Sequence, residues 1–227
     1  MILAVTAGKG GVGKSTVAYN LGAELDAVVI DADLGMADLP ATRGPDLHDV
    51  LAGRAAPLEA VREGGPVSLL PCGRSLAGVR AADPTALCDA VAAVADCYDS
   101  VVIDSPAGLR SDAGLPLLAA DACLLVTRPT RAAIADALRA RELARAIETP
   151  LARVVLNRVE PDRLGEPDDR TERIASTLGG PVTKIPESTA LARAQRAGRP
   201  VRRVAPDASS TAQFEQLAAT VKQSVGP

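Results

Sequence analysis

A glycine- and lysine-rich segment near the N-terminus restricts this chain more than any other part of its sequence. Residues 8–16, GKGGVGKST, directly follow an apolar run over residues 2–5 and precede a segment with apolar side chains at helical spacing. Such a turn can surround an anion, because backbone N–H groups and the positive end of the following helix converge on it. Lys14 adds a positive charge and Ser15 a hydroxyl that can bind Mg²⁺. The segment therefore predicts a phosphate-binding loop between a strand and a helix.

Short apolar runs alternate with longer segments of helical periodicity along the whole chain. This alternation is typical of an α/β fold with a mostly parallel central sheet and helices on both faces. We expect strands at residues 2–6, 27–31, 67–71, 100–104, 122–127, 152–157 and 182–185. We expect helices at residues 46–52, 83–95, 130–147, 168–178, 188–197 and 209–224. Since no repeat or low-complexity linker interrupts the 227 residues, we expect a single domain over residues 1–227.

Composition excludes several classes of protein. The chain has 25 Lys and Arg residues against 28 Asp and Glu, which gives a net charge of −3 and no strong overall attraction to nucleic acid or anionic lipid. Aromatic residues make up only 1% and tryptophan is absent, which disfavours a surface that stacks on single-stranded RNA. The chain begins without a signal-peptide pattern and has no apolar run of about 18 residues. We therefore expect a cytoplasmic protein.

The cysteines and the single histidine show no metal-binding pattern. Cys72, Cys88, Cys97 and Cys123 form no CxxC pair, and we expect them to be small buried side chains instead of metal or cluster ligands. His48 lacks nearby ligand companions, so we expect a surface or helix residue.

Lys9 has no function in a plain phosphate loop, which needs only one lysine. The arrangement GKGGVGKST resembles the deviant Walker A motif of the MinD/ParA family of ATPases, in which the first lysine reaches across a dimer interface to the partner's nucleotide. The resemblance implies a P-loop NTPase fold, ATP and Mg²⁺ as ligands, an ATP-dependent homodimer, and catalytic functions for Lys9 and Lys14. It implies ATP contacts from Gly8, Lys9, Gly10, Gly11, Val12, Gly13, Lys14, Ser15 and Thr16.

Two further apolar runs end in aspartates. Residues 28–39, VVIDADLGMADL, are similar to the first switch of the family, which implies that Asp33 positions the attacking water and that Asp31 supports the Mg²⁺ site. Residues 101–108, VVIDSPAG, are similar to a Walker B element and to the second switch of MinD more than that of ParA. They imply that Asp104 reaches Mg²⁺, directly or through water, together with Ser15 and Asp33. A single aspartate at a strand end could simply cap a turn, but three such elements in the expected order favour the ATPase.

Two segments near the C-terminus resemble the adenine-side elements of the family. They contain Asn157, whose amide can pair with the edge of a base, and Pro186. The alternative is that Asn157 only forms a turn at the end of a strand. The polar stretch over residues 158–167 follows that strand and is expected to border the base.

The chain departs from the family in two places. Its last expected helix has one apolar face but only Lys222 as a positive charge, so we expect it to dock on the core, and direct membrane binding is doubtful. The densest basic cluster could bind DNA, as in ParA relatives, but a solvated arginine surface is favoured; the cluster consists of Arg193, Arg196, Arg199, Arg202 and Arg203.

These features together favour a regulatory ATPase. The resemblance implies a slowly hydrolysing, partner-stimulated switch that dimerises with ATP and controls spatial positioning, as MinD does in cell division. The alternative is a ParA-like ATPase that partitions DNA. An ATP-dependent synthetase of the same fold is less favoured, because such enzymes generally lack the first lysine.

Overall fold

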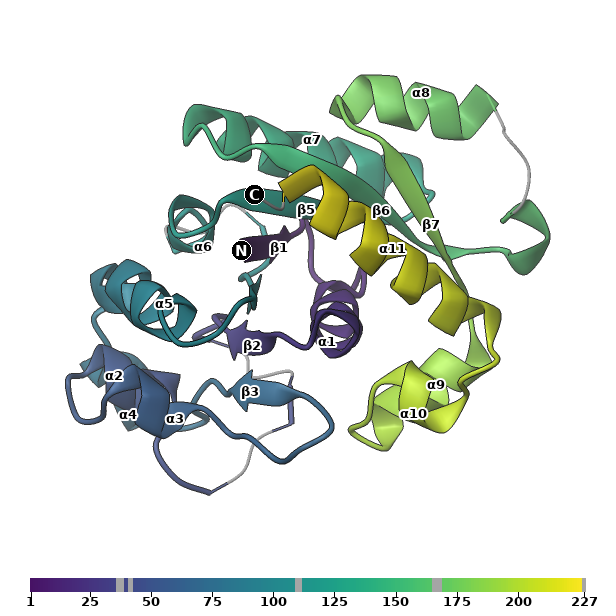
Figure 1. Ribbon diagram of the computed structural model, residues 1–227. Helices are drawn as coiled ribbons and strands as arrows, with labels where there is room; N and C mark the ends of the chain where they lie inside the picture. Colours follow the sequence, from purple (N-terminus) through teal and green to yellow (C-terminus); the bar gives the residue numbers. More distant parts are fainter. Residues whose placement is uncertain (36–38, 41–42, 109–111, 165–168, 226–227) are drawn as a thin grey trace.

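The computed structural model describes residues 1–35, 39–40, 43–108, 112–164 and 169–225. Its centre is a sheet of seven strands in the order β3-β2-β4-β1-β5-β6-β7, and all neighbouring strands pair in parallel (Figure 1). The strands are β1 (Ile2–Thr6), β2 (Val28–Asp31), β3 (Ser68–Leu70), β4 (Val101–Asp104), β5 (Ala122–Thr127), β6 (Leu151–Val159) and β7 (Val182–Pro186). All seven expected strands are therefore present, and β6 extends two residues beyond its expected end.

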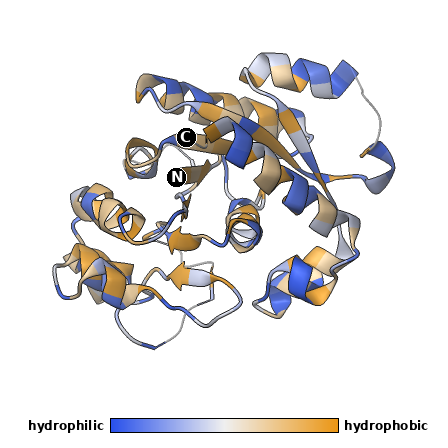
Figure 2. Ribbon diagram, in the orientation of Figure 1, coloured by the Kyte–Doolittle hydropathy of each residue, from blue (hydrophilic) through white to orange (hydrophobic). Residues whose placement is uncertain are grey.

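The strands are continuous apolar runs because helices cover both faces of the sheet. Alternate residues of one strand pack into different cores: Leu3 and Val5 of β1 join one cluster, whereas Ala4 between them joins another. In the same way, Val29 of β2 lies on the opposite face from Ile30. Figure 2 shows the central strands as hydrophobic and helix α8 (Asp169–Leu178) as largely hydrophilic. The single α/β domain with helices on both faces is confirmed.

Helices α1, α9, α10 and α11 contribute to the core on one face. The other face packs against α2, α3, α5, α6, α7 and α8. The longer helices are α1 (Lys14–Leu25), α5 (Leu87–Ala95), α7 (Arg131–Ala146), α8 (Asp169–Leu178), α9 (Thr189–Arg196) and α11 (Ser209–Val225). The shorter ones are α2 (Leu47–Leu51), α3 (Pro57–Ala60), α4 (Leu76–Ala81), α6 (Leu115–Leu118), α10 (Val201–Val204) and the 3₁₀ turns η1 (Pro84–Ala86) and η2 (Pro161–Arg163).

The sequence did not predict α3, α4, α6 and α10, since helices of four to six residues show little hydrophobic periodicity. The equally short α2 was predicted, at residues 46–52. Asp83 caps η1, and this turn leads into α5, so the expected helix begins as a 3₁₀ turn. The expected helix start at residue 168 lies outside the described residues.

The C-terminal helix α11 docks on the core as expected. Phe214, Leu217 and Val221 are buried against α1 and the neighbouring strands. Among the residues that the structure describes, no helix is both long and apolar enough to cross a membrane.

The expectations about single side chains have different outcomes. His48 is a helix residue, as one of its two expected positions required: it lies in α2 and is buried, with its Nε2 3.1 Å from the Leu34 carbonyl oxygen. Cys72 and Cys123 are buried as expected, whereas Cys88 is half-buried and Cys97 is exposed. Cys97 follows the last turn of α5, between Asp96 and Tyr98, and faces solvent, so the expectation of burial is wrong for this residue.

Candidate nucleotide-binding site

Three strands bring the candidate residues to one edge of the sheet. In the register of the parallel ladder, Asp31 at the end of β2 pairs with Asp104 at the end of β4, and Asp104 also pairs with Val5 of β1. The glycine-rich loop leaves β1 at this same edge and enters α1. The topology therefore places both acidic motifs beside the loop, where open α/β sheets bind ligands.

The loop has the backbone that an anion cradle requires. Gly11 and Gly13 have φ values of 78° and 97°, in the left-handed region that favours glycine. A Cβ built on Gly10 or Gly11 would meet nothing within 4 Å, so these residues border open space. A Cβ on Gly8 would instead lie 1.8 Å from the Asp136 carbonyl oxygen of α7. Gly8 therefore allows the loop to approach α7 closely.

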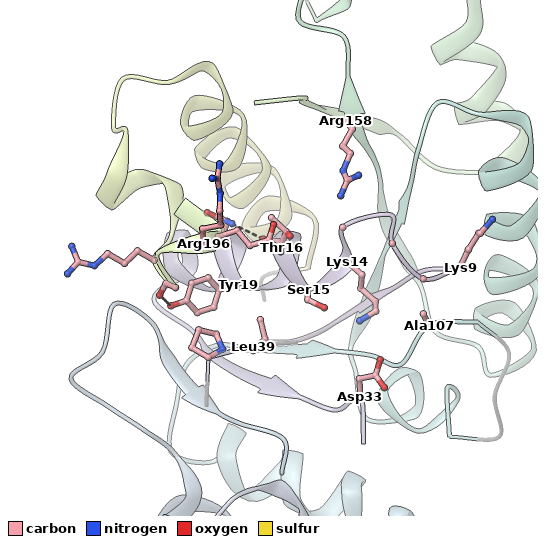
Figure 3. Close-up of a pocket in the computed structure, with 18 of the residues that line it drawn as sticks. Lys9, Lys14, Ser15, Thr16, Tyr19, Asp33, Leu39, Ala107, Arg158 and Arg196 are labelled. Carbon is pink, nitrogen blue, oxygen red and sulfur yellow. Dashed lines mark hydrogen bonds between the residues drawn. The ribbon is translucent and has the colours of Figure 1, made fainter. Parts of the chain in front are cut away.

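The loop borders a hollow of about 680 Å³, which we call the loop hollow (Figure 3). Of the predicted ATP-binding residues, seven line it: Lys9, Gly10, Gly11, Gly13, Lys14, Ser15 and Thr16. Asp33 lines it as well. The hollow, the left-handed glycines and the nearby carboxylates together fit a triphosphate and Mg²⁺.

Lys14 and Asp104 form a buried ion pair. The distance from Lys14 Nζ to Asp104 Oδ1 is 2.6 Å, and the side chains are only 6% and 0% exposed. Asp33 is 8% exposed beside this pair. The structure thus brings together the lysine and the two aspartates that the sequence singled out.

Asp31 is a buried carboxyl group of the site with a strongly raised pKa. Burial, and next the negative charge of Asp104, raise its pKa to about 7. Its Oδ1 accepts a 3.3 Å hydrogen bond from the Asp33 backbone N–H, and among the described residues its Oδ2 has no hydrogen-bond partner. Burial and a neighbouring negative charge disfavour the charged form of this carboxyl group. A buried carboxyl group that lies beside two further carboxylates, Asp33 and Asp104, is typical of a site that binds a cation.

Lys9 does not join this group. Its side chain is exposed, and Figure 3 shows it directed away from Lys14 and Asp33. Within one chain, the predicted catalytic residues Lys14 and Asp33 therefore lie close together, whereas the Lys9 ammonium group points outward.

Asn157 is held by the loop backbone. Its Nδ2 donates a 2.8 Å hydrogen bond to the Val12 carbonyl oxygen, and its Oδ1 accepts one of 2.9 Å from the Arg158 backbone N–H. Asn157 is 2% exposed, and neither Asn157 nor Pro186 is among the residues that line the loop hollow. Contact of these two residues with a base stays a prediction.

Sequence reasoning did not assign several residues that line the hollow. Tyr19 and Asn20 on α1 attach the segment after α9: the Tyr19 hydroxyl donates to the Gly198 carbonyl oxygen at 2.9 Å, and the Asn20 Oδ1 accepts from the Val201 N–H at 2.7 Å. The available signal was the spacing of polar residues on one side of the helix after the loop.

The predicted arginine cluster is divided between different environments. Arg196 and Arg199 line the loop hollow, whereas Arg202 approaches Glu24 of α1 at 3.5 Å. Arg158, which follows Asn157, also lines the hollow. Part of the cluster thus belongs to the ligand-binding side of the protein.

The loop, its acidic partners and the parallel sheet define a nucleotide-binding domain of the P-loop class. The family model of the CobQ/CobB/MinD/ParA nucleotide binding domain matches residues 3–201, and the chain belongs to this family.

Known proteins support this assignment. An ATP-binding protein of Methanocaldococcus jannaschii is 40% identical over 173 residues, which cover 71% of this chain and 66% of that protein. The structure of the cell division ATPase MinD from Pyrococcus furiosus has a TM-score of 0.87 and 30% identity, with 98% of each chain covered. The septum site-determining protein MinD from Pyrococcus horikoshii, complexed with Mg-ADP, has a TM-score of 0.87 and 28% identity, with 99% of this chain and 97% of that chain covered.

Proposed function

We propose that this protein is a slow ATPase that acts as a regulatory switch, dimerises when it binds ATP, and controls the position of other cellular components. The observation that carries the proposal is the division of the site: Lys14, Asp33 and Asp104 meet at the loop, whereas the exposed Lys9 points away from them. The likeness to the cell division ATPase MinD over nearly the whole chain supports the positioning role.

Each residue of the site then has a defined task. The loop amides and Lys14 hold the triphosphate, and Ser15 and Asp104 hold Mg²⁺, with Asp31 in support. Bound Mg²⁺ neutralises charge on the phosphate oxygens. Asp33 orients a water molecule for attack on the terminal phosphate, so the first switch follows the state of the nucleotide.

Lys9 completes the site of the partner subunit. A cation supplied in trans acts like an arginine finger, a class of group that accelerates phosphoryl transfer by about 10³–10⁵. A monomer is then nearly inactive, and a partner protein that stabilises the dimer stimulates turnover. We expect this switch to work in the cytoplasm, without direct membrane binding and without DNA as its principal partner.

The test compares wild type with Lys9→Ala. Light scattering with a non-hydrolysable ATP analogue and Mg²⁺ should give a dimer for wild type, and phosphate release should fall at least about 100-fold in Lys9→Ala. Lys222→Ala, which removes an exposed lysine at the far end of α11, is the matched control and should behave as wild type. If Lys9→Ala retains both dimer formation and turnover, Lys9 does not act in trans.

A further inference from the structure

Two buried side chains behind the site contact the backbone of the first switch. The Cys72 thiol donates a 3.4 Å hydrogen bond to the Asp33 carbonyl oxygen, and His48 Nε2 lies 3.1 Å from the Leu34 carbonyl oxygen. Cys72 and His48 are each only 1% exposed, and the distance from Cys72 Sγ to His48 Nε2 is 3.5 Å. The two side chains therefore form one buried cluster that reaches two successive carbonyl groups of the switch.

The His48 ring has a defined orientation in this cluster. A carbonyl oxygen can only accept a hydrogen bond, so Nε2 carries a proton and donates it to Leu34. The other ring nitrogen, Nδ1, faces the backbone of Gly73 and Gly78, where a Cβ at either position would collide with it. The absence of these two side chains gives the imidazole its space, and the close glycine backbones restrict its movement.

Backbone contacts join the two segments that carry the cluster. His48 lies on α2, whose first turn is capped by the side chain of Asp46. The Leu47 N–H next to it donates to the Pro71 carbonyl oxygen at 2.9 Å, and Cys72 follows Pro71 in the chain. Helix α2 is thus attached to the end of β3, and the imidazole and the thiol lie side by side behind β2.

The backbone of Asp33 is held at both of its polar groups. Its N–H donates to Asp31 Oδ1 at 3.3 Å, and its carbonyl oxygen accepts from the Cys72 thiol. Figure 3 shows the Asp33 carboxylate directed toward Lys14. Because this carboxyl group is only one carbon atom away from Cα, the position of the backbone largely determines where the carboxylate lies. Groups that take part in catalysis need such support from surrounding hydrogen bonds.

We propose that His48 and Cys72 are positioning residues for ATP hydrolysis, which hold the backbone of the first switch so that the Asp33 carboxylate is aimed at the attacking water. This inference rests on the proposed function, in which Asp33 orients that water. Neither His48 nor Cys72 is among the residues that line the loop hollow. Their loss therefore lowers the rate of the chemical step and leaves the binding of ATP unchanged.

Two substitutions of His48 separate its hydrogen bond from its packing. The amide nitrogen of His48→Gln can take the place of Nε2, whereas the shorter amide of His48→Asn does not reach the Leu34 carbonyl oxygen. We expect His48→Asn to lower kcat for phosphate release by about 10- to 100-fold, the effect of a small misplacement of a catalytic group, with KM and the calorimetric affinity for ATP unchanged. His48→Gln should recover most of the loss.

A second pair of variants tests the thiol independently. Cys72→Ala removes the donor to Asp33 and should lower kcat in the same way, whereas Cys72→Ser keeps a donor and should restore it. Cys123→Ala is the matched control, because Cys123 is also 1% exposed but lies in β5 and packs into a different core. It should keep the kcat of wild type.

A double-variant cycle shows whether His48 acts through Asp33. In an Asp33→Ala background, His48→Asn should cause no further loss of single-turnover phosphate release, because the group that it positions is already absent. A further loss in that background would overturn the proposal, as would equal losses for His48→Asn and His48→Gln. If His48→Asn does not fold, the same comparisons with Cys72→Ala and Cys72→Ser decide.

The failure of this inference differs from the failure of the proposed function. A wild-type protein that neither binds nor hydrolyses ATP would contradict the proposed function itself. A wild-type protein that hydrolyses ATP, with unchanged kcat in His48→Asn and Cys72→Ala, would contradict only the positioning role. A loss of activity that is explained entirely by weaker ATP binding would also overturn that role.

Discussion

The buried carboxyl group of Asp31 should make the stability of the nucleotide-free protein depend on pH. Asp31 is 1% exposed and lies opposite Asp104 in the ladder between β2 and β4. Burial and the charge of Asp104 raise its pKa from 3.8 to about 7. Asp31→Asn keeps the shape of the side chain and the acceptor for the Asp33 N–H but removes the charge. It therefore isolates the cost of burying that charge.

The magnitude follows from the pKa shift. Below about pH 4, Asp31 is protonated in both the folded and the unfolded protein, so its burial costs no charge desolvation. Between about pH 4 and 7 the unfolded chain loses the proton and the folded protein keeps it, so the stability of wild type falls as pH rises. Above pH 7 the full cost is present, which is about 4 kcal/mol for a shift of this size. This corresponds to a Tm difference of roughly 8–16 °C for a chain of this length.

Urea denaturation without nucleotide, from pH 4.5 to 8.5, measures this effect. Asp31→Asn should be more stable than wild type by as much as about 4 kcal/mol at pH 8.5, and the difference should fall to about 1 kcal/mol at pH 4.5. Asp207→Asn, which removes an exposed charge, should show no comparable gain. A gain that is the same at every pH, or a loss of stability at pH 8.5, would refute the reasoning.

Two glycines give further predictions. Gly22→Ala should destabilise the protein by about 1–3 kcal/mol in urea denaturation, because the new Cβ would lie 2.2 Å from Val29 Cγ2. The double variant with Val29→Ala should lose less stability than the sum of the two single losses, and additive losses would contradict this packing. Gly13→Ala should weaken ATP binding at least tenfold in calorimetry, because its φ is 97° and its Cβ would lie 2.2 Å from Asn157 Nδ2. Gly53→Ala, with a φ of 69° and open space around it, is the control; similar losses in both variants would point to a general effect of left-handed alanine.

The sequence predicted the strands well because burial on both faces makes each one a continuous apolar run. Val101 to Asp104 is an example, since all four residues are buried. The short helices gave no such signal: α6 is only four residues long and owes its burial to Pro116 and Leu117. Their positions depend on tertiary contacts, which no local pattern contains.

The site was predictable only where its residues are adjacent in sequence. The loop and the strand-end aspartates belong to short motifs with a fixed geometry. The contact of Asn157 with Val12 joins residues 145 positions apart, and the burial of His48 depends on the Leu34 carbonyl oxygen. Arginine spacing alone did not separate Arg196 and Arg199, which line the loop hollow, from the other three arginines of the cluster.

The ion pair between Lys14 and Asp104 should couple the binding of the two ligands that we propose for this site, the nucleotide and Mg²⁺. In the nucleotide-free protein each side chain neutralises the other at 2.6 Å, with almost no contact with solvent. If Lys14 turned to a phosphate alone, Asp104 would lose the opposite charge of this buried pair, and breaking a buried pair by removing one partner costs about 3–5 kcal/mol. A cation that reaches Asp104 at the same time removes this cost. The pair therefore favours the joint entry of nucleotide and Mg²⁺, and it opposes a switch that responds to either ligand alone.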